Sequence, residues 1–401
     1  MKEKKMKMVN VPNLRFSEFR DEWSEKKLGE IAEISRGKSK HRPRDAAFLY
    51  GGKYPFVQTG DIKNAGLFLE TYSQTYSEEG LKQSKLWNEN TLCITIAANI
   101  AETAILKIKA CFPDSIIGLI PRNNQSNVIF IKYQFDNFKS EVQKLSEGIA
   151  QANLNQEKLS NISFAFPSLS EQTKIANFLS LLDERISTQS QIIDNLQSLI
   201  KTTCKVYHNS VEKTEYKIAD LGSSFRVMNL SKEDLSVEGE KCILYGELFT
   251  TYDCVIDEIV SFTECNSSQK SLSGENDLLF PASTTVDSLS LISPSAISIK
   301  NVILGGDMFG IHLNKNFNNE YVSYVINYVY KIEFAKYAQG STIIHLYYND
   351  IKNIKIMLPN LDIQNFLADL MRLLRNKIQN EQKLLSAYQK QKAYLLQQIF
   401  I

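Results

Sequence analysis

The sequence lacks the cysteine and histidine patterns of a disulfide-stapled or metal-bound fold. Its six cysteines, at positions 93, 111, 204, 242, 254 and 265, include no C-x-x-C pair, and only four histidines are present. This scatter excludes the usual ligand spacings of a zinc site and is typical of free thiols in a reducing compartment. With 401 residues, 43% of them hydrophobic, the chain can bury a large core without such staples.

Long apolar runs and an excess of one charge are also missing. No run approaches the ~18 to 20 apolar residues of a membrane span, and the lysine-rich start, residues 1–10, has no apolar stretch of the signal-peptide kind. We therefore expect a cytoplasmic protein with no membrane contact. The net charge of +1 gives no overall attraction to nucleic acid, so any affinity for DNA must come from local patches or from a partner.

Catalytic motifs are absent as well. There is no G-x-G-x-x-G, H-E-x-x-H or G-x-S-x-G. The R-G-K-S at 36–39 ends like a phosphate-binding loop, but Ala32 stands where that loop needs a glycine. Glu215, Lys217 and Asp194 resemble the acidic and lysine set of metal-dependent nucleases, and we interpret them as solvated charges. The chain is predicted to catalyse no reaction and to hold no metal and no cofactor.

What the sequence does contain is a pair of matched long helices. Residues 171–207 carry apolar side chains at steps of four and three, and residues 363–399 repeat this register 192 positions later. At ~1.5 Å per residue each helix would be about 55 Å long, which favours a spacer over a packing element of one small core. The predicted seam residues are Ile175, Leu179, Leu182, Ile186, Gln189, Ile193, Leu196, Ile200, Leu367, Met371, Leu374, Ile378, Glu381, Leu385, Tyr388 and Leu395.

The alternative, two helices packed into an ordinary core, is less consistent with their polar outer faces. Apolar residues outside the seam, such as Ile192 and Leu384, leave room for a third partner. Gln189 and Glu381 are the midpoints of the two stretches. If the helices run antiparallel, we expect these two polar residues to face each other and fix the register.

The rest of the chain is repeated too. Leu28-Gly29 is matched by Leu221-Gly222, and Pro167 by Pro359. In the first copy short apolar runs at 54–57, 92–96, 104–108 and 116–120 predict strands, and residues 128–145 predict a helix. The ends of the copies are alike, whereas the middles differ: the basic segment, residues 36–44, has no basic counterpart in residues 225–234. We therefore expect one scaffold that occurs twice and carries a different surface in each copy.

Candidate nucleic-acid contacts fall on the loops of both copies. Lysine and arginine neutralise phosphates, and arginine, amide and hydroxyl groups can read base edges. Solvated charge and ordinary turn chemistry remain the alternative at each position. The candidates are Arg36, Lys38, Lys40, Arg42, Arg44, Gln58, Thr59, Asp61, Asn99, Gln151, Asn153, Tyr245, Ser283, Thr284, Thr285, Ser341, Thr342 and His345.

Three stretches carry a family resemblance: VPNLRFSEFRDEW at 11–23, LGEIAEISRGK at 28–38 and NLNQEKLSNISFAFPSLSEQTKIANFLSLLDERI at 153–186. They resemble the specificity (S) subunit of type I restriction-modification systems. The second copy departs from the pattern, with Ile363-Gln364 in place of Glu-Gln. The resemblance implies an α+β fold with two pseudo-repeated, mixed α/β target-recognition domains, at 11–167 and 211–359. Each is followed by a long spacer helix, at 168–210 and 360–401, and the two helices pair as an antiparallel coiled coil.

The same resemblance implies a non-catalytic subunit that binds double-stranded DNA. Each domain would read one half of a bipartite, asymmetric target. Two methylating (M) subunits, which bind S-adenosylmethionine, and two restriction/translocase (R) subunits, which use ATP and Mg²⁺, would join it. The assembled complex would be an ATP-dependent endonuclease and an adenine-N6 DNA methyltransferase. The alternatives are a coiled-coil adaptor that does not bind DNA, an RNA-binding module, or a methyltransferase with built-in specificity.

Overall fold

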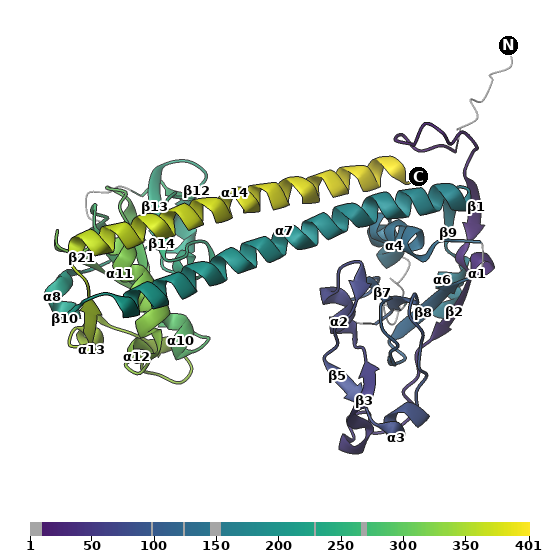
Figure 1. The fold of residues 1–401 in the computed structure, drawn as a ribbon, viewed down its shortest axis with the longest axis horizontal. Coiled ribbons are helices and arrows are strands. Elements are labelled where there is room, and N and C mark those ends of the chain that lie inside the picture. The colour runs from purple at the N-terminus through teal and green to yellow at the C-terminus, as the bar shows by residue number, and fades with distance from the viewer. Residues whose placement is uncertain (1–9, 98, 123–124, 145–153, 228–229, 266–270) are drawn as a thin grey trace, which may run out of the picture. The chain divides into compact units, whose positions relative to one another are not determined.

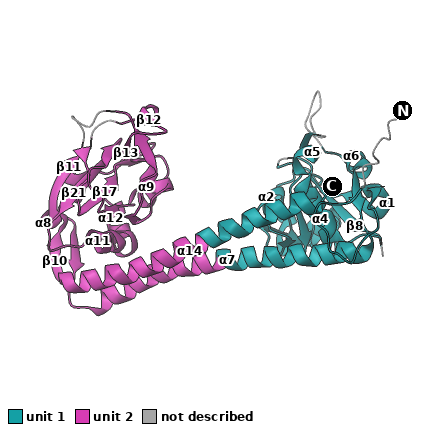
Figure 2. Ribbon diagram, turned by 90° about the horizontal axis from the view of Figure 1, so that it is seen from above, with its two compact units in different colours: residues 1–190, 383–401 teal, residues 191–382 magenta. Residues whose placement is uncertain are grey.

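The computed structural model describes residues 10–97, 99–122, 125–144, 154–227, 230–265 and 271–401. The chain divides into two compact units: unit 1 holds residues 1–190 and 383–401, and unit 2 holds residues 191–382 (Figure 2). Each unit thus contains one repeated domain and a part of both long helices. The two units are described one at a time.

The first domain, in unit 1, is built on a five-stranded sheet (Figure 1). In spatial order its strands are β2 (Ala32–Arg36), β8 (Ile116–Pro121), β6 (Leu92–Thr95), β7 (Thr103–Leu106) and β4 (Phe68–Leu69). Neighbouring strands are antiparallel except β4 with β7. Because β6 and β7 are buried along their whole length, three of the four residues of each strand are apolar, and the fourth is a buried threonine.

Short elements surround this sheet. The antiparallel pair β1 (Ser24–Lys27) and β9 (Ser163–Phe166) joins the start of the domain to its exit, and β3 (Tyr50–Phe56) pairs with β5 (Gln74–Tyr76). The helices are α1 (Leu28–Ile31), η1 (Ala47–Leu49), α2 (Thr59–Asn64), α3 (Glu78–Lys82), α4 (Val128–Asn137), α5 (Lys139–Lys144) and α6 (Gln156–Asn161). The helix expected over residues 128–145 is therefore two helices, because the backbone leaves the helical region at Phe138.

The second domain, in unit 2, repeats the main sheet with the same strand order and directions. Its strands are β11 (Gly222–Arg226), β21 (Met308–Leu313), β17 (Asp277–Pro281), β19 (Ser295–Ile297) and β14 (Val255–Ile256). β10 (Thr214–Lys217) pairs with β23 (Lys355–Leu358) as β1 pairs with β9. The predicted pair of pseudo-repeated mixed α/β domains is thus confirmed.

The middle of the second domain differs from that of the first. It adds a second five-stranded sheet of β12 (Leu235–Ser236), β15 (Ser261–Thr263), β13 (Glu240–Leu244), β20 (Ile303–Gly305) and β16 (Ser271–Leu272), and a pair of β18 (Ser283–Thr284) with β22 (Ile344–His345). The remaining elements are α8 (Ile218–Leu221), η2 (Lys232–Asp234), α9 (Glu247–Thr250), α10 (Ser288–Leu291), α11 (Asn319–Val325), a π-helical turn η4 (Ile326–Tyr330), α12 (Lys331–Ala335) and α13 (Tyr348–Ile351).

The two long helices are α7 (Leu169–Ser210) and α14 (Leu361–Ile399). Within unit 1 they run antiparallel: the Lys392 ammonium lies 2.6 Å from the Asp183 carboxylate, and the Arg185 guanidinium lies 5.5 Å from the centroid of the Tyr388 ring. Every predicted seam residue is buried or half-buried, whereas Ile192, Leu199, Leu373 and Leu384 outside the seam are exposed. Gln189 and Glu381 are both buried but belong to different units, so their mutual facing stays a prediction.

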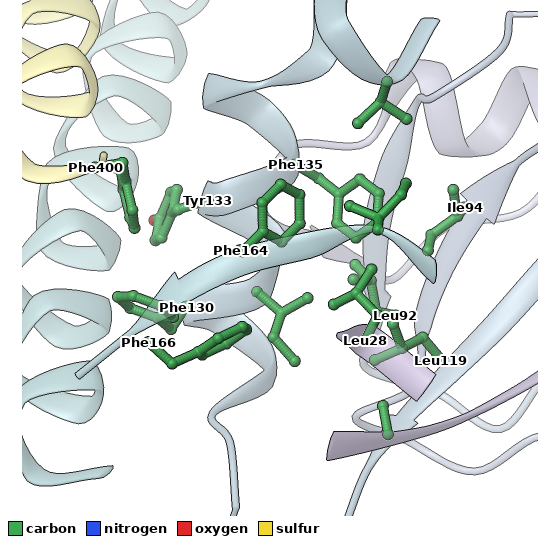
Figure 3. Close-up of a cluster of buried hydrophobic side chains, with 14 of the residues drawn as sticks. Leu28, Leu92, Ile94, Leu119, Phe130, Tyr133, Phe135, Phe164, Phe166 and Phe400 are labelled. Carbon is green, nitrogen blue, oxygen red and sulfur yellow. The ribbon is translucent and has the colours of Figure 1, made fainter. Parts of the chain in front are cut away.

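The core of unit 1 runs from the sheet to the end of α14 (Figure 3). Leu92 and Leu119 come from the sheet, Phe130 from α4 and Phe166 from β9. The Phe130 ring stacks in tilted contacts against Phe166, at 5.7 Å between centroids, and against Phe400, at 5.2 Å. At about 2 kcal/mol for each buried side chain of this size, the C-terminal residues are an integral part of the first domain.

A buried glutamine ties each long helix to its domain. Gln172 donates from Nε2 to the Pro167 carbonyl at 3.0 Å and accepts at Oε1 from the backbone N–H of Asn127, also at 3.0 Å. Gln364 does the same with Pro359, at 2.8 Å, and Asn318, at 3.0 Å. Since Asn127 and Asn318 cap α4 and α11, this one side chain joins two helices in each domain. The proline and glutamine that recur at the end of both domains therefore join the long helix to the domain before it.

Three further findings concern all described residues. None of the helices there is both long and apolar enough to cross a membrane. Those residues contain no group of three or more His, Cys, Asp or Glu placed to hold a metal ion. The six cysteines all lie among them, and none forms a disulfide.

Candidate nucleic-acid interface

The basic segment, residues 36–44, begins at the last residue of β2 and packs against the loop before β8. Gly37 makes this possible, because a Cβ there would lie 2.2 Å from the carbonyl oxygen of Pro113. The backbone N–H of Lys38 donates to the Phe112 carbonyl at 3.1 Å, and the Ser84 hydroxyl donates to the Lys38 carbonyl at 2.8 Å. The position of the segment is therefore fixed by its backbone, which leaves its side chains available for other contacts.

Those side chains divide into two groups. Arg36 and Arg44 both bind Asp114, Arg36 through the backbone carbonyl at 3.0 Å and Arg44 through the carboxylate at 2.7 Å, while Arg42 donates to the carbonyls of its own loop. Lys38 and Lys40 are exposed. Arginines held in place can present their remaining donors at a fixed angle, whereas exposed lysines act as mobile charges.

Lys85 adds a third cation beside the exposed Lys38 and Lys40, and the three lysines together form a basic face. Its ammonium lies 3.5 Å from the centroid of the buried Trp87 ring, and burial together with nearby Lys38 lowers the pKa of Lys85. Lys85 is far from the basic segment in sequence. Hydrogen bonds that join Ser84 and Gln83 to the segment, and the stacking of Trp87 on Phe112, bring it there.

The polar candidates of the first domain are largely engaged in turn chemistry. Asp61 caps α2, since its carboxylate accepts from the Gln58 N–H at 2.8 Å and from the Ser73 hydroxyl at 3.1 Å. Gln58 donates from its amide to Gln74 at 2.6 Å, and Thr59 is half-buried at the helix start. Asn99 is exposed, with a φ of +52°. The remaining candidates, Gln151 and Asn153, lie outside the described residues.

In the second domain β18 and β22 bring several candidates together. Ser283 pairs with His345 across the two strands, and Thr284 follows. Thr285, Ser341 and Thr342 lie exposed in the flanking turns. The His345 ring stacks nearly parallel on the exposed Tyr347, with 5.8 Å between centroids. Tyr347 was not a candidate from sequence, and its proximity to His345 in the chain was the available signal.

A groove of about 1340 Å³ opens beside these residues. Arg226, Asp307 and Tyr347 are in its lining, and Asp307 lies 3.9 Å from the Nδ1 of His345. The candidate Tyr245 adjoins it, because a Cβ on the lining residue Gly306 would lie 2.7 Å from the Tyr245 ring. The groove therefore offers a cation, a carboxylate and aromatic faces in one place.

The strand register corrects the expectation that residues 225–234 contain no basic counterpart of the basic segment. Arg36 is the last residue of β2 and pairs with Ile117 of β8; Arg226 is the last residue of β11 and pairs with Phe309 of β21. Both arginines thus occupy the same place at the edge of the repeated sheet. The sequence match of Leu28-Gly29 with Leu221-Gly222, at an offset of 193, was wrong, because Leu28 begins α1 whereas Leu221 ends α8, and β2 and β11 lie 190 positions apart.

Comparison with known proteins gives one family for both domains. The type I restriction modification DNA specificity domain matches residues 20–198 and again residues 211–387. A putative type I restriction enzyme MjaX specificity subunit from Methanocaldococcus jannaschii is 24% identical, over 94% of this chain and 92% of that protein. The MjaIX specificity subunit of the same organism is 20% identical, over 94% and 92%.

Solved structures agree on the fold. The S subunit of a type I restriction-modification system from M. genitalium has a TM-score of 0.60 at 15% identity, covering 98% of this chain and 99% of that one. A chain from a study of complex assembly and conformational transition of the type I R-M system has a TM-score of 0.55 at 12% identity, covering 93% and 96%. The two domain matches together span most of the sequence. This chain belongs to the family of the type I restriction modification DNA specificity domain, of which it carries two copies.

Proposed function

We propose that this chain is the DNA specificity subunit of a type I restriction-modification complex. Each target-recognition domain reads one half of a bipartite, asymmetric sequence in double-stranded DNA. The observation that carries this proposal is the repeat itself: two matches to one specificity domain, on two sheets with the same strand order, present different loops at the same edge. Two different surfaces on one scaffold suit two different half-sites.

The chemistry of the two surfaces supports DNA reading by different means. In the first domain Lys38, Lys40 and Lys85 form a basic face suited to phosphates, and Arg36 is held by Asp114. In the second domain Arg226 shares its groove with a carboxylate and tyrosines. Arginine can bind a guanine edge with two hydrogen bonds, and a carboxylate can accept from the cytosine amino group. Both arginines stand at the start of these surfaces.

The partners in this proposal are two methylating and two restriction/translocase subunits. Repeated exposed apolar residues on the long helices support two equivalent docking sites. Leu181 and Leu373 are 192 positions apart, as are Ile192 and Leu384, and all four side chains are exposed. Exposed leucines at repeated positions suit two copies of one partner.

The reactions of the complex belong to those partners. S-adenosylmethionine binds to the methylating subunits, and ATP and Mg²⁺ to the restriction/translocase subunits, so the complex acts as an adenine-N6 methyltransferase and an ATP-dependent endonuclease. The chain itself contributes sequence recognition and catalyses no step. It works in the cytoplasm, where DNA and the partners meet.

The test replaces one recognition surface at a time. Residues 35–160 are exchanged for those of another family member, and methylated adenines are mapped across the host genome by single-molecule sequencing. One half of the methylated motif should change while the other half and the gap stay the same. The matched control exchanges residues 225–350, which should change only the other half.

Three results would contradict the proposal. A change in both halves from a single exchange would exclude one domain per half-site. A methylation pattern that does not depend on this chain would favour an adaptor or an RNA-binding role. Micromolar binding of S-adenosylmethionine by the purified chain alone would favour a methyltransferase.

A further inference from the structure

Each half of the chain ends in a helix that packs against the domain of the other half. The first half is residues 1–210 and ends with α7; the second half is residues 211–401 and contains α14. In unit 1 the C-terminal end of α14 packs on the first domain, and in unit 2 the C-terminal end of α7 packs on the second domain. Because the halves repeat, each helix could in principle pack on the domain of a second copy of its own half.

One arrangement pairs each half with the other half of the chain, and the alternative pairs it with a second copy of itself. The first contact that distinguishes them lies at the helix ends. Phe400, just after α14, stacks on Phe130; the residue 192 positions earlier is His208, whose Nδ1 lies 3.0 Å from the Tyr321 hydroxyl. Phe130 and Tyr321 are equivalent, since each is three residues after the asparagine cap of its helix. An apolar pair in unit 1 thus corresponds to a hydrogen-bonded pair in unit 2.

Pairing of like halves would mismatch these residues. In two first halves His208 would lie against Phe130 of the other copy, where its buried ring nitrogen has no partner. In two second halves Phe400 would lie against Tyr321 of the other copy, whose buried hydroxyl would lose its bond. A buried polar group left without its hydrogen bond is destabilising, so both like pairs are disfavoured.

The second contact lies further along the helices and involves charge. Asp183 accepts a hydrogen bond from the Tyr133 hydroxyl at 2.8 Å and forms its ion pair with Lys392. The residue 192 positions after Asp183 is Arg375, which donates to the Tyr324 hydroxyl at 2.7 Å. Tyr133 and Tyr324 are again equivalent, six residues after their helix caps. The same tyrosine therefore meets a carboxylate in one domain and a guanidinium in the other.

The opposing helix is adapted to this inversion of charge. Lys392 lies opposite Asp183, whereas its equivalent Ile200 lines the same groove as Arg375. Arg375 takes its counter-charges from its own domain, with two bonds to Asp257 at 2.7 and 2.9 Å. Two second halves would bring Arg375 towards Lys392 of the other copy, and two first halves would place Asp183 opposite Ile200.

We propose that these two contacts make the helix and domain surfaces of each half specific for the complementary half of this chain and reject a second copy of the same half. Like charges meet in one wrong pair, a half-buried carboxylate loses its cation in the other, and the ring contacts mismatch in both. Under the proposed function, every assembled subunit would then carry two different recognition domains. The pairing itself does not depend on DNA binding.

The experiment starts from the intact, folded chain. A protease site is inserted after Glu212, between α7 and β10, and the purified protein is cut there. The cut chain is dissociated in urea, refolded by dilution and weighed by native mass spectrometry. Random pairing would give mixed and like pairs in equal amounts. We expect mixed pairs in at least about tenfold excess, the ratio that ~1.4 kcal/mol of selectivity produces. Like pairs in random proportion would overturn the proposal.

Two variants test the residues. Lys392→Ile with Phe400→His gives the second half the residues of the first, so pairs of two second halves should rise severalfold. The matched control, Lys390→Ile with Gln389→His, changes exposed positions of the same helix and should leave the ratio unchanged. In the uncut chain Asp183→Lys and Lys392→Asp should each lower the urea midpoint, and their combination should recover it in part. Additive losses together with an unchanged pairing ratio would also overturn the proposal.

Discussion

The two domains share a scaffold and differ at its edge. Both build the same five-stranded sheet, whose first strand, β2 or β11, ends in an arginine. In both, a buried glutamine holds the long helix to the domain. After that arginine the first domain continues with Gly37 pressed against Pro113, and the second with Val227 beside an open groove. The sheet and the helix joint are held by contacts that both domains share, whereas the segments after β2 and β11 make contacts that differ between the two domains and can diverge.

A second difference lies at the entrance to the long helices. Glu171 is buried and binds Arg15 with two hydrogen bonds of 2.7 Å each, so the N-terminal segment is fastened to α7. The equivalent residue of α14 is Ile363, which is half-buried. An ion pair fastens the N-terminal segment to the long helix in the first copy, whereas the second copy has an apolar residue at that position. This contrast has the largest expected effect on stability.

Glu171→Ile, which gives the first copy the residue of the second, should lower the free energy of unfolding by about 3–5 kcal/mol. The reason is that Arg15 is left in a nearly buried site without its carboxylate. Urea unfolding followed by circular dichroism measures the loss. The matched exchange Ile363→Glu should cost less than half as much. Equal losses of unfolding free energy in the two variants would show that the ion pair of Arg15 with Glu171 does not fasten the N-terminal segment to α7.

The ring contacts of the two helix ends should differ in their response to acid. Burial and the nearby Lys213 lower the pKa of His208 to about 4, from the usual 6.5. The unfolded imidazole takes up its proton near pH 6.5 and the folded one only near pH 4. Stability is therefore fully present above pH 6.5 and falls by up to about 3 kcal/mol as the pH drops to 4. Unfolding midpoints measured from pH 7 to 4.5 would reveal the slope.

His208→Phe, which copies the residue found at position 400, should flatten that part of the pH profile. Phe400 has no proton to gain, so the corresponding contact in unit 1 contributes no slope. His41→Phe, in the loop of the first domain, serves as the control and should leave the slope intact. A slope that survives His208→Phe would assign the acid response to other groups.

The two buried glutamines should behave alike, which sharpens the shared part of the comparison. Gln172→Ala and Gln364→Ala each remove a partly buried hydrogen bond to a backbone N–H and a buried hydrogen bond to a proline carbonyl. We expect each to cost about 2 kcal/mol. Gln389→Ala, on the exposed face of α14, should cost less than ~0.5 kcal/mol. Urea midpoints that differ strongly between the two glutamine variants would break the equivalence of the two joints.

The smallest expected effect separates the two recognition surfaces. Lys38→Ala and Lys40→Ala should each reduce the slope of log binding constant against log salt concentration by about one, because each removes one phosphate contact. The assay uses the chain assembled with its methylating subunits on target DNA. Lys355→Ala, on β23 in an ion pair with Glu215, is the matched control in the second domain and should leave the slope unchanged. No change for either Lys38 or Lys40 would remove the basic segment from the interface.

Much of the fold could be predicted from the sequence because its signals are local and repeated. The steps of four and three along residues 171–207 and 363–399 predict long amphipathic helices, which the structure contains as α7 and α14. The shared exit motif marks the end of each domain. The helix expected at 128–145 is broken at Phe138, where no local sequence pattern signals the break.

The candidate site was less accessible to sequence reasoning. The basic segment stood out by its composition, but Lys85 joins it only through contacts between distant parts of the chain. Arg226 escaped notice because the sequence comparison set the offset between the copies at 193, whereas the strand register sets it at 190. Asp61, a candidate from its polar neighbourhood, caps a helix in the structure.

The sequence by itself determined the repeat, the two long helices and the family, because periodic apolar positions and short motifs are set by neighbouring residues. The tertiary structure alone decided which residues meet. Asp183 and Lys392 are separated by 209 positions, and His208 and Tyr321 by 113. Their complementarity arises only when antiparallel helices carry each half to the domain of the other. Such contacts depend on packing in space, for which no local pattern exists.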